Sequence, residues 1–229
     1  MRNLDGAVLL TIVMGLSLGA AGPARAAPAP ATAPAIGASA VVEPARAVVD
    51  DSGPGVLIDT AARAMLAELD AHRAEFRQSA ARVNALVDRI LLPYFDTDYA
   101  ARLVLARHWT TASVEQRRRF VAAFYHSLLA NYGAALVDFT GERLKVLPFT
   151  GAAAATTATI RTRVRKSDGT DVAVNYSLHR TPPQGWRVWD VVIEGISYVK
   201  SFRDDFNAQI EQQGVDALIA RLEKQTGGG

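Results

Sequence analysis

The sequence predicts an α+β domain in which helices precede and follow a curved, four-stranded antiparallel sheet around an apolar cavity. Apolar residues recur every three or four positions from 58 to 132, every second position from 144 to 193, and every three or four positions again beyond 198. The links between the alternating segments are short, and short links join antiparallel neighbours. This order of blocks is typical of an α+β domain. A curved antiparallel sheet of this kind can form a cone that holds an apolar ligand.

Four helices are expected before the sheet. The apolar stripes of the first three are Ile58, Ala61, Ala62, Met65, Leu66 and Leu69, then Val83, Leu86, Val87, Ile90 and Leu91, then Tyr99, Leu103 and Val104. Pro93 ends the second helix and Asp96 can cap the third. Ser113 and Gln116 have the form of a capping box that opens a long fourth helix, expected to end at Gly141.

Four strands follow at a period of two residues. They are expected near residues 144–148, 157–165, 172–179 and 186–193, with a turn at Asp168-Gly169. Simple alternation in the last strand puts Trp186, Val188, Asp190 and Val192 on one side and Arg187, Trp189, Val191 and Ile193 on the other. Gly195 then passes the strand directly to a helix that Ser197 can cap. Helices over residues 201–213 and 215–222 complete the chain.

The N-terminus has the features of a cleavable secretory signal. An apolar run from Ala7 to Ala21 leads to Ala24-Arg25-Ala26, so residues 1–26 are interpreted as the signal peptide. Residues 27–54 are rich in Ala and Pro and lack periodicity, which indicates a disordered tether. A single domain is expected over residues 55–226, with a loose tail at 227–229.

Composition excludes several classes of protein. Without the signal segment the chain has 23 basic and 22 acidic residues, a balance that gives no reason to expect a nucleic-acid partner. Cysteine is absent, so there is no disulfide, no thiolate metal site and no lipidated cysteine. The protein is therefore expected to be soluble and periplasmic and to depend on its hydrophobic core. We expect a monomer, but the sequence does not fix the oligomeric state.

Motifs for catalysis or metal binding are incomplete. The four histidines, at 72, 108, 126 and 179, have no metal-ligand spacing. Gly195-Ile196-Ser197 begins a nucleophile elbow, but Val199 stands where its second glycine belongs. Asp190 is the one candidate general base, because it lies in the middle of an apolar strand. The alternative, which we favour, is that Asp190 and Gly195 are structural and that Asp190 accepts hydrogen bonds at the corner between strand and helix.

Several stretches together are similar to one family. They are Ile90–Phe95 with Tyr99-Ala100, Ser113–Phe124, Tyr132-Gly133, Trp186–Ser197, Phe202-Arg203 with Phe206, and Gly214–Ile219. In this order they resemble the MlaC-type, or toluene-tolerance, family of phospholipid-binding ABC-transporter auxiliary proteins. The resemblance implies a non-enzymatic shuttle without cofactor. Its cargo would be glycerophospholipid, carried between an outer-membrane lipoprotein complex and an inner-membrane ABC transporter with an MCE component. This transport would maintain the lipid asymmetry of the outer membrane.

On that resemblance the acyl chains are expected between the sheet and the long helix. The residues expected to line them are Tyr94, Phe120, Phe124, Leu128, Val146, Ile160, Val174, Tyr176, Val188, Val192 and Ile196. Residues 117–119, Arg161 and Arg163 are weaker candidates for partner contact. Two alternatives stay open: an NTF2-like isomerase, dehydratase or hydrolase that uses Asp190, and a periplasmic adaptor with a solid core that binds only proteins. The sequence leaves open the direction of transport, the lipid preference and the number of lipids bound.

Overall fold

The computed structural model describes residues 49–138, 144–152, 154–165 and 168–226, and residues 47–229 form one compact unit. The expected signal peptide, most of the tether and the C-terminal tail lie outside the described residues. Within them, Val49 already packs against the core and Pro54 begins the first helix. None of the helices in these ranges combines the length and hydropathy needed to cross a bilayer.

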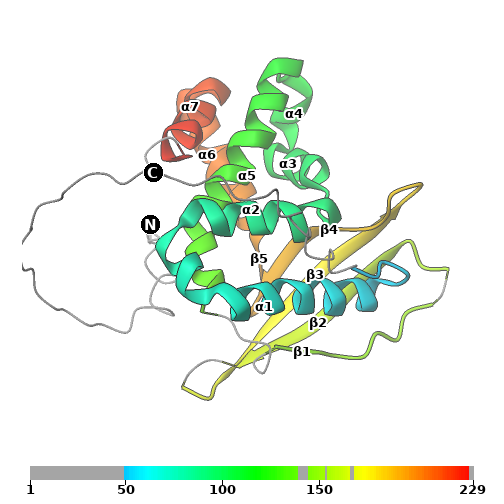
Figure 1. Ribbon diagram of the computed structural model, residues 1–229. Coiled ribbons are helices and arrows are strands. Elements are labelled where there is room, and N and C mark those ends of the chain that lie inside the picture. The colour runs from blue at the N-terminus through cyan, green and yellow to red at the C-terminus, as the bar shows by residue number, and fades with distance from the viewer. Residues whose placement is uncertain (1–48, 139–143, 153, 166–167, 227–229) are drawn as a thin grey trace, which may run out of the picture. The chain divides into compact units, whose positions relative to one another are not determined.

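The fold is α+β, as the sequence predicts (Figure 1). The helices before the sheet are α1 Pro54–Gln78, α2 Ala80–Ile90, the 3-10 helix η2 Leu92–Tyr94, α3 Thr97–Leu105, α4 Arg107–Thr111 and α5 Val114–Leu136. The strands are β1 Leu144–Val146, β2 Thr157–Arg165, β3 Asp171–Thr181, β4 Gly185–Ile193 and β5 Ile196–Ser197. The last helices are α6 Tyr198–Gln213 and α7 Val215–Thr226.

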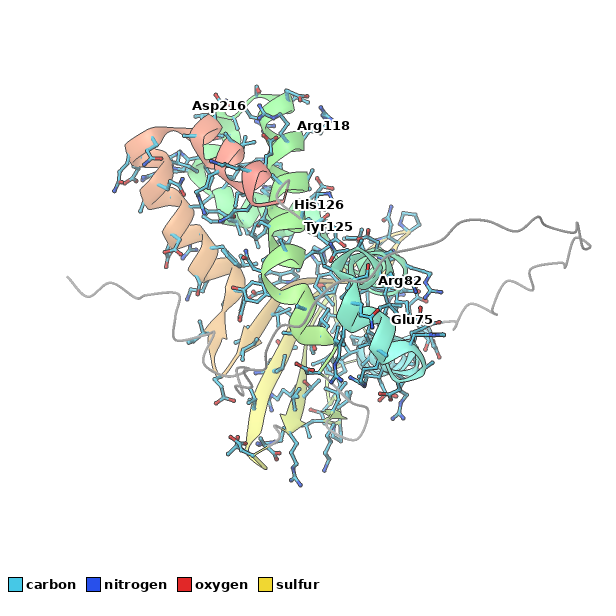
Figure 2. All side chains as sticks on the ribbon, turned by 60° about the vertical axis from the view of Figure 1, so that its left-hand side comes forward. Glu75, Arg82, Arg118, Tyr125, His126 and Asp216 are labelled. Carbon is cyan, nitrogen blue, oxygen red and sulfur yellow. The ribbon has the colours of Figure 1, made fainter. Side chains whose placement is uncertain are left out.

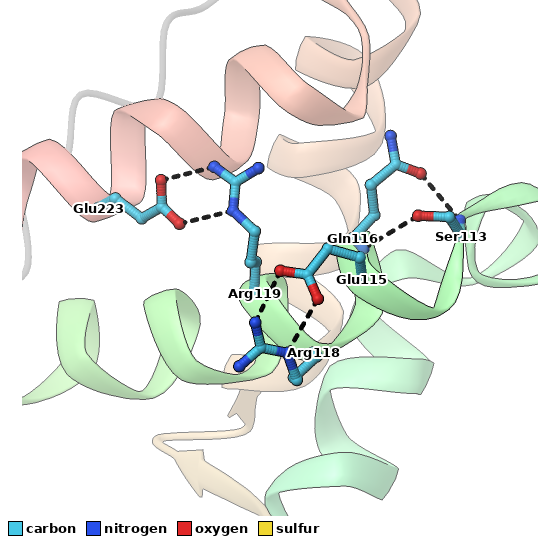
Figure 3. A network of polar contacts seen from close by, with 6 residues as sticks. All are labelled: Ser113, Glu115, Gln116, Arg118, Arg119 and Glu223. Atoms are coloured by element: carbon cyan, nitrogen blue, oxygen red, sulfur yellow. Dashed lines mark hydrogen bonds and ion pairs between the residues drawn. The ribbon is translucent and has the colours of Figure 1, made fainter.

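Three helices begin at the caps that the sequence predicts. Asp96 accepts from the backbone N–H of Tyr99 at 2.9 Å, and Ser197 accepts from that of Lys200 at 3.1 Å. Ser113 and Gln116 form the complete capping box of α5 (Figure 3). These three predictions are confirmed, whereas α5 ends at Leu136, before the expected Gly141.

The sheet has five strands in the order β1-β2-β3-β4-β5, all antiparallel, rather than the four expected. The extra strand arises because Glu194 and Gly195, with φ of 49° and 82°, form a tight two-residue turn. Two central residues with positive φ are what a type I′ hairpin requires. Ile196 and Ser197 therefore pair back onto β4 before α6 begins.

A β-bulge in β4 overturns the simple alternation expected for this strand. Leu178 of β3 pairs with Val188, but the preceding residue of β3, Ser177, pairs with Asp190, so Trp189 is an extra residue. Side chains beyond it change sides. Val191 and Ile193 share a face with Val188, while Asp190 and Val192 lie on the opposite face, contrary to the prediction.

The two faces of the sheet are covered differently. We call the face that packs against α1 the inner face and the other the outer face; α1 lies across the strands in Figure 1. Helices α3, α5, α6 and α7 share a second core, which is centred on Phe120 and Leu218. A third core joins α1, α2 and α5, where the hydroxyl of Tyr125 donates to Asp88 of α2 (Figure 2).

Candidate functional site

One end of the inner face is a closed core. Ala158, Ile160, Leu178, Trp186 and Val188 pack against Leu57 and Ile58 of α1, and all seven are buried. Tyr94, Phe95, Val146, Phe149 and Tyr176 border this cluster. Because Ile160 is fully buried and Val188 is 2% exposed, the centre of this cluster is closed, whereas the residues that border it keep part of their surface.

The inner face continues past this core with apolar side chains that are only half-buried. We call them the half-buried patch: Val172, Val174, Tyr176, Val191 and Ile193. They are neighbours across the strands, since Tyr176 pairs with Val191 and Val174 pairs with Ile193. Apolar area that the protein leaves uncovered in mid-sheet favours an apolar ligand by about 25 cal/mol per Å² removed from water.

Tyr176 lies where the half-buried patch meets the closed core. Burial raises the pKa of its phenol. The residue nevertheless keeps part of its accessible surface. Tyr176 therefore adds an aromatic residue to the apolar surface that a ligand on the inner face would cover.

Exposed apolar groups stand at the edge of the half-buried patch. Ile196, which pairs with Ile193, is 55% exposed, and Tyr132 of α5 is 39% exposed. The ring of Tyr132 meets that of Tyr198 edge to face, with centroids 5.8 Å apart, and burial raises the pKa of both phenols. Tyr198 in turn contacts Phe202, which links this edge to the helical core.

The structure gathers some of the expected lining residues and separates others. Tyr94, Val146, Ile160, Tyr176 and Val188 come together at the inner face, and the strand register adds Val174. Phe120 and Phe124 instead stack on each other inside the helical core, and Leu128 packs against that core. Val192 lies on the outer face because of the bulge, and Ile196 stands at the edge. Their role in lipid binding stays a prediction.

Sequence reasoning missed Val172, Val191, Ile193, Tyr132 and Tyr198. Both sides of β4 are apolar in the sequence, so no local pattern showed that Val191 and Ile193 share a face with Val188. Val172 was placed on the right strand but not in the lining. Nothing in the sequence distinguished Tyr132 and Tyr198 from core aromatics.

Asp190 is buried, and both of its carboxylate oxygens have partners. Oδ2 accepts from the Ser197 hydroxyl at 2.6 Å and Oδ1 from the backbone N–H of Val199 at 3.0 Å. These contacts tie the end of β4 to the start of α6. The bulge also turns Asp190 away from the inner face, so it does not lie beside the half-buried patch where a general base would be needed.

A second polar contact joins the outer face to α3. His179 Nε2 lies 2.9 Å from Oδ2 of Asp96, the residue that caps α3, and the rings of His179 and Tyr99 are 4.6 Å apart. Trp189 packs edge to face on Tyr99. Among the described residues, no cluster of acidic and histidine side chains has the composition to hold a metal ion.

The arginines at the start of α5 have partners within the protein. Arg119 forms a bidentate pair with Glu223 of α7 at 2.8 and 3.0 Å, and Arg118 pairs with Glu115 (Figure 3). Arg117 lies over the ring of Trp109. Arg161 and Arg163 are exposed on the outer face.

A shallow pocket of about 290 Å³ also lies on the outer face. It is lined by Phe149, Gly151, Thr157, Ala158, Thr159, Ser177, Leu178 and Trp189. Its volume is at the lower limit of the roughly 300–1,000 Å³ typical of small-molecule sites. A lipid with two acyl chains therefore does not fit it, and the inner face is the better candidate.

Known proteins similar to this chain include proteins named for phospholipid binding or transport. A family model described as MlaC protein matches residues 59–224. The chain is 23% identical over 181 residues to the intermembrane phospholipid transport system binding protein MlaC of Haemophilus influenzae, covering 78% of this chain and 85% of that protein. It is 28% identical over 153 residues to the toluene tolerance protein ttg2D of Pseudomonas putida, covering 66% and 70%.

A solved structure extends the similarity to the fold. The phospholipid-binding protein from Ralstonia solanacearum, determined in complex with a phospholipid, superposes with a TM-score of 0.69 at 26% identity. The alignment covers 74% of this chain and 94% of that one.

Proposed function

The chain belongs to the MlaC protein family, and from that premise we propose that it is a soluble periplasmic carrier of glycerophospholipid. It shuttles lipid between an outer-membrane lipoprotein complex and an inner-membrane ABC transporter with an MCE component, and so maintains outer-membrane lipid asymmetry. It works as a monomer, without catalysis and without a cofactor, and the phospholipid is its cargo.

The observation that carries the proposal is the half-buried patch. Two acyl chains with about thirty methylenes would cost on the order of 20 kcal/mol to expose to water, at about 0.8 kcal/mol per CH₂. Val174, Tyr176 and Ile193 offer apolar surface that the protein itself leaves uncovered. The Ralstonia relative, which was determined with a phospholipid bound, supports lipid as the occupant.

The contacts of Asp190 weigh against an enzyme. A general base needs a free oxygen beside the substrate, whereas both oxygens of Asp190 are engaged and face α6. Transfer from bilayer to an equally apolar site is nearly neutral in free energy, so the carrier itself requires no nucleotide.

Native mass spectrometry of protein purified without detergent tests the proposal. Wild-type protein is expected to carry phospholipid, and Val174→Trp is expected to reduce the occupancy because the indole fills the space beside the half-buried patch. Asn175→Trp is the matched control, since Asn175 is the next residue of the same strand but lies on the outer face. A wild-type chain that is bare and also takes no lipid from vesicles would refute the carrier and leave the protein-binding adaptor.

A further inference from the structure

The outer face of β1 and β2 carries cations that have no carboxylate partner among the described residues. Lys145, Arg161 and Arg163 are exposed, and their neighbours along the strands point inward and are buried or half-buried. We call these three residues the outer basic face. Arg165 lies on the same side, but it is neutralised by Asp171 at 3.0 Å.

Several arginines elsewhere on the surface pair with carboxylates. Arg63 pairs with Asp59, Arg118 with Glu115, and Arg82 with Glu75, the last pair labelled in Figure 2. On the outer basic face, by contrast, Lys145 stands directly opposite Arg163 in the strand register. Like charges directly opposite each other destabilise a sheet, so these cations do not serve the stability of the fold.

The surroundings of these cations suit a flat, charged surface better than a protein surface. The outer-face residues of β3 beside them are Ala173, Asn175 and Ser177, which are short. Protein interfaces are held by central aromatic or other large anchors surrounded by a polar rim. The large aromatic residues near this face, Phe149 and Trp189, line the pocket at the Thr157 end of β2 and do not lie among the three cations. The long cationic side chains therefore surround short residues and can reach the headgroups of an anionic bilayer.

We propose that Lys145, Arg161 and Arg163 form a docking surface for an anionic phospholipid bilayer. The assignment goes beyond the carrier function and depends on it only for the choice of a lipid surface. The inner face, with the half-buried patch, stays free for cargo because it lies on the opposite side of the same strands. Each basic residue near such a surface contributes about a five-fold change in affinity, so the three together contribute on the order of 100-fold.

Flotation with vesicles of phosphatidylglycerol and phosphatidylcholine tests the proposal, with pure phosphatidylcholine vesicles as the neutral reference. Wild-type protein is expected to bind the anionic vesicles at low salt and to be released as the salt concentration rises. The triple variant Lys145→Gln, Arg161→Gln and Arg163→Gln is expected to lose on the order of 100-fold in affinity. Glutamine keeps the strands polar, and removal of opposed charges is not expected to lower the melting temperature.

The matched control is the triple variant Arg63→Gln, Arg82→Gln and Arg118→Gln. It changes the net charge by the same amount at exposed residues on α1, α2 and α5 that already have acidic partners. The control is expected to bind anionic vesicles nearly as wild type does. An equal loss of affinity in both triple variants would show that net charge alone determines vesicle binding, and it would overturn the assignment.

Two further results would also overturn it. One is the absence of wild-type binding to anionic vesicles at low salt. The other is binding to immobilised poly-glutamate without binding to vesicles, which would indicate an acidic protein as the partner. Lipid occupancy measured by native mass spectrometry on the same samples separates this proposal from the carrier function, because the outer basic face does not contact the cargo site.

Discussion

A single extra residue, Trp189, decides which β4 side chains face the candidate cargo site. The sequence predicted the strand and its ends, and it singled out Asp190, but it assigned Asp190 and Val192 to the wrong face. Alternation is a local rule, whereas a bulge depends on how the partner strand pairs. The structural interpretation of Asp190, in contrast, was reachable from the sequence because a buried carboxylate needs donors, and Ser197 follows seven residues later.

Asp190→Asn tests the role of this carboxylate at the corner between β4 and α6. A hydrogen bond to a charged group contributes about 1.5–3 kcal/mol, so the free energy of unfolding in urea is expected to fall by about 2 kcal/mol. Phospholipid occupancy is expected to persist. Asp205→Asn, at an exposed residue of α6, is the control and is expected to leave the unfolding free energy unchanged. Unchanged stability in Asp190→Asn would contradict the structural role.

At the scale of elements, the sequence located three helix caps and misplaced the end of α5. Asp96, Ser113 and Ser197 cap helices as predicted, because a cap is a contact between residues three positions apart. The end of α5 was placed too late, since Gly141 is only one of several residues that can follow a helix and tertiary packing selects among them. The strand β5 was missed because it is two residues long.

Gly195→Ala tests the turn that creates β5. Gly195 has a φ of 82°, where any side chain is strained even though an added Cβ would meet no atom within 4 Å, so a loss of about 1 kcal/mol in unfolding free energy is expected. Gly55→Ala is the control, and it is expected to raise the unfolding free energy rather than lower it. Gly55 lies in α1 with ordinary van der Waals room, and the same substitution there is expected to add about 0.5 kcal/mol. A neutral Gly195→Ala would show that the turn tolerates another conformation.

At the scale of the whole molecule, the order of helices and strands was predictable because it depends on residue periodicity along the chain. The surface that the inner face leaves half-buried was not. Phe120 and Tyr176 are both aromatic residues on apolar stripes, yet Phe120 is fully buried among helices and Tyr176 is only half-buried. The difference depends on the distance between elements, which a pattern along one chain does not encode.

Because several tyrosines are buried, the free energy of unfolding of the domain is expected to depend on pH in the alkaline range. Burial raises the pKa of Tyr94, Tyr125, Tyr132, Tyr176 and Tyr198. The folded state therefore holds these protons more tightly than the unfolded state, in which tyrosine has a pKa of about 10. The stabilisation is fully present below about pH 10 and is lost as the pH rises through the higher folded-state values.

Urea unfolding at a series of alkaline pH values measures this effect. Unfolding free energy is expected to decline above about pH 10, and more slowly in Tyr176→Phe, which removes one of the titrating groups. Ultraviolet absorbance of tyrosinate gives an independent reading of the same titration in the folded protein. A wild-type stability that stays flat across this range would contradict the burial of these phenols.

The extra residue in β4 can be lost without moving the residues that follow it. A deletion of Trp189 alone would make the pairing regular and would leave Asp190 opposite Ser177 and Val191 opposite Tyr176, so these side chains would keep their faces. If Trp189 instead stayed and paired with Ser177, Asp190 would turn toward the inner face and Val191 away from it. Relatives that carry the same cargo are therefore expected either to keep the bulge or to be one residue shorter between Val188 and Asp190.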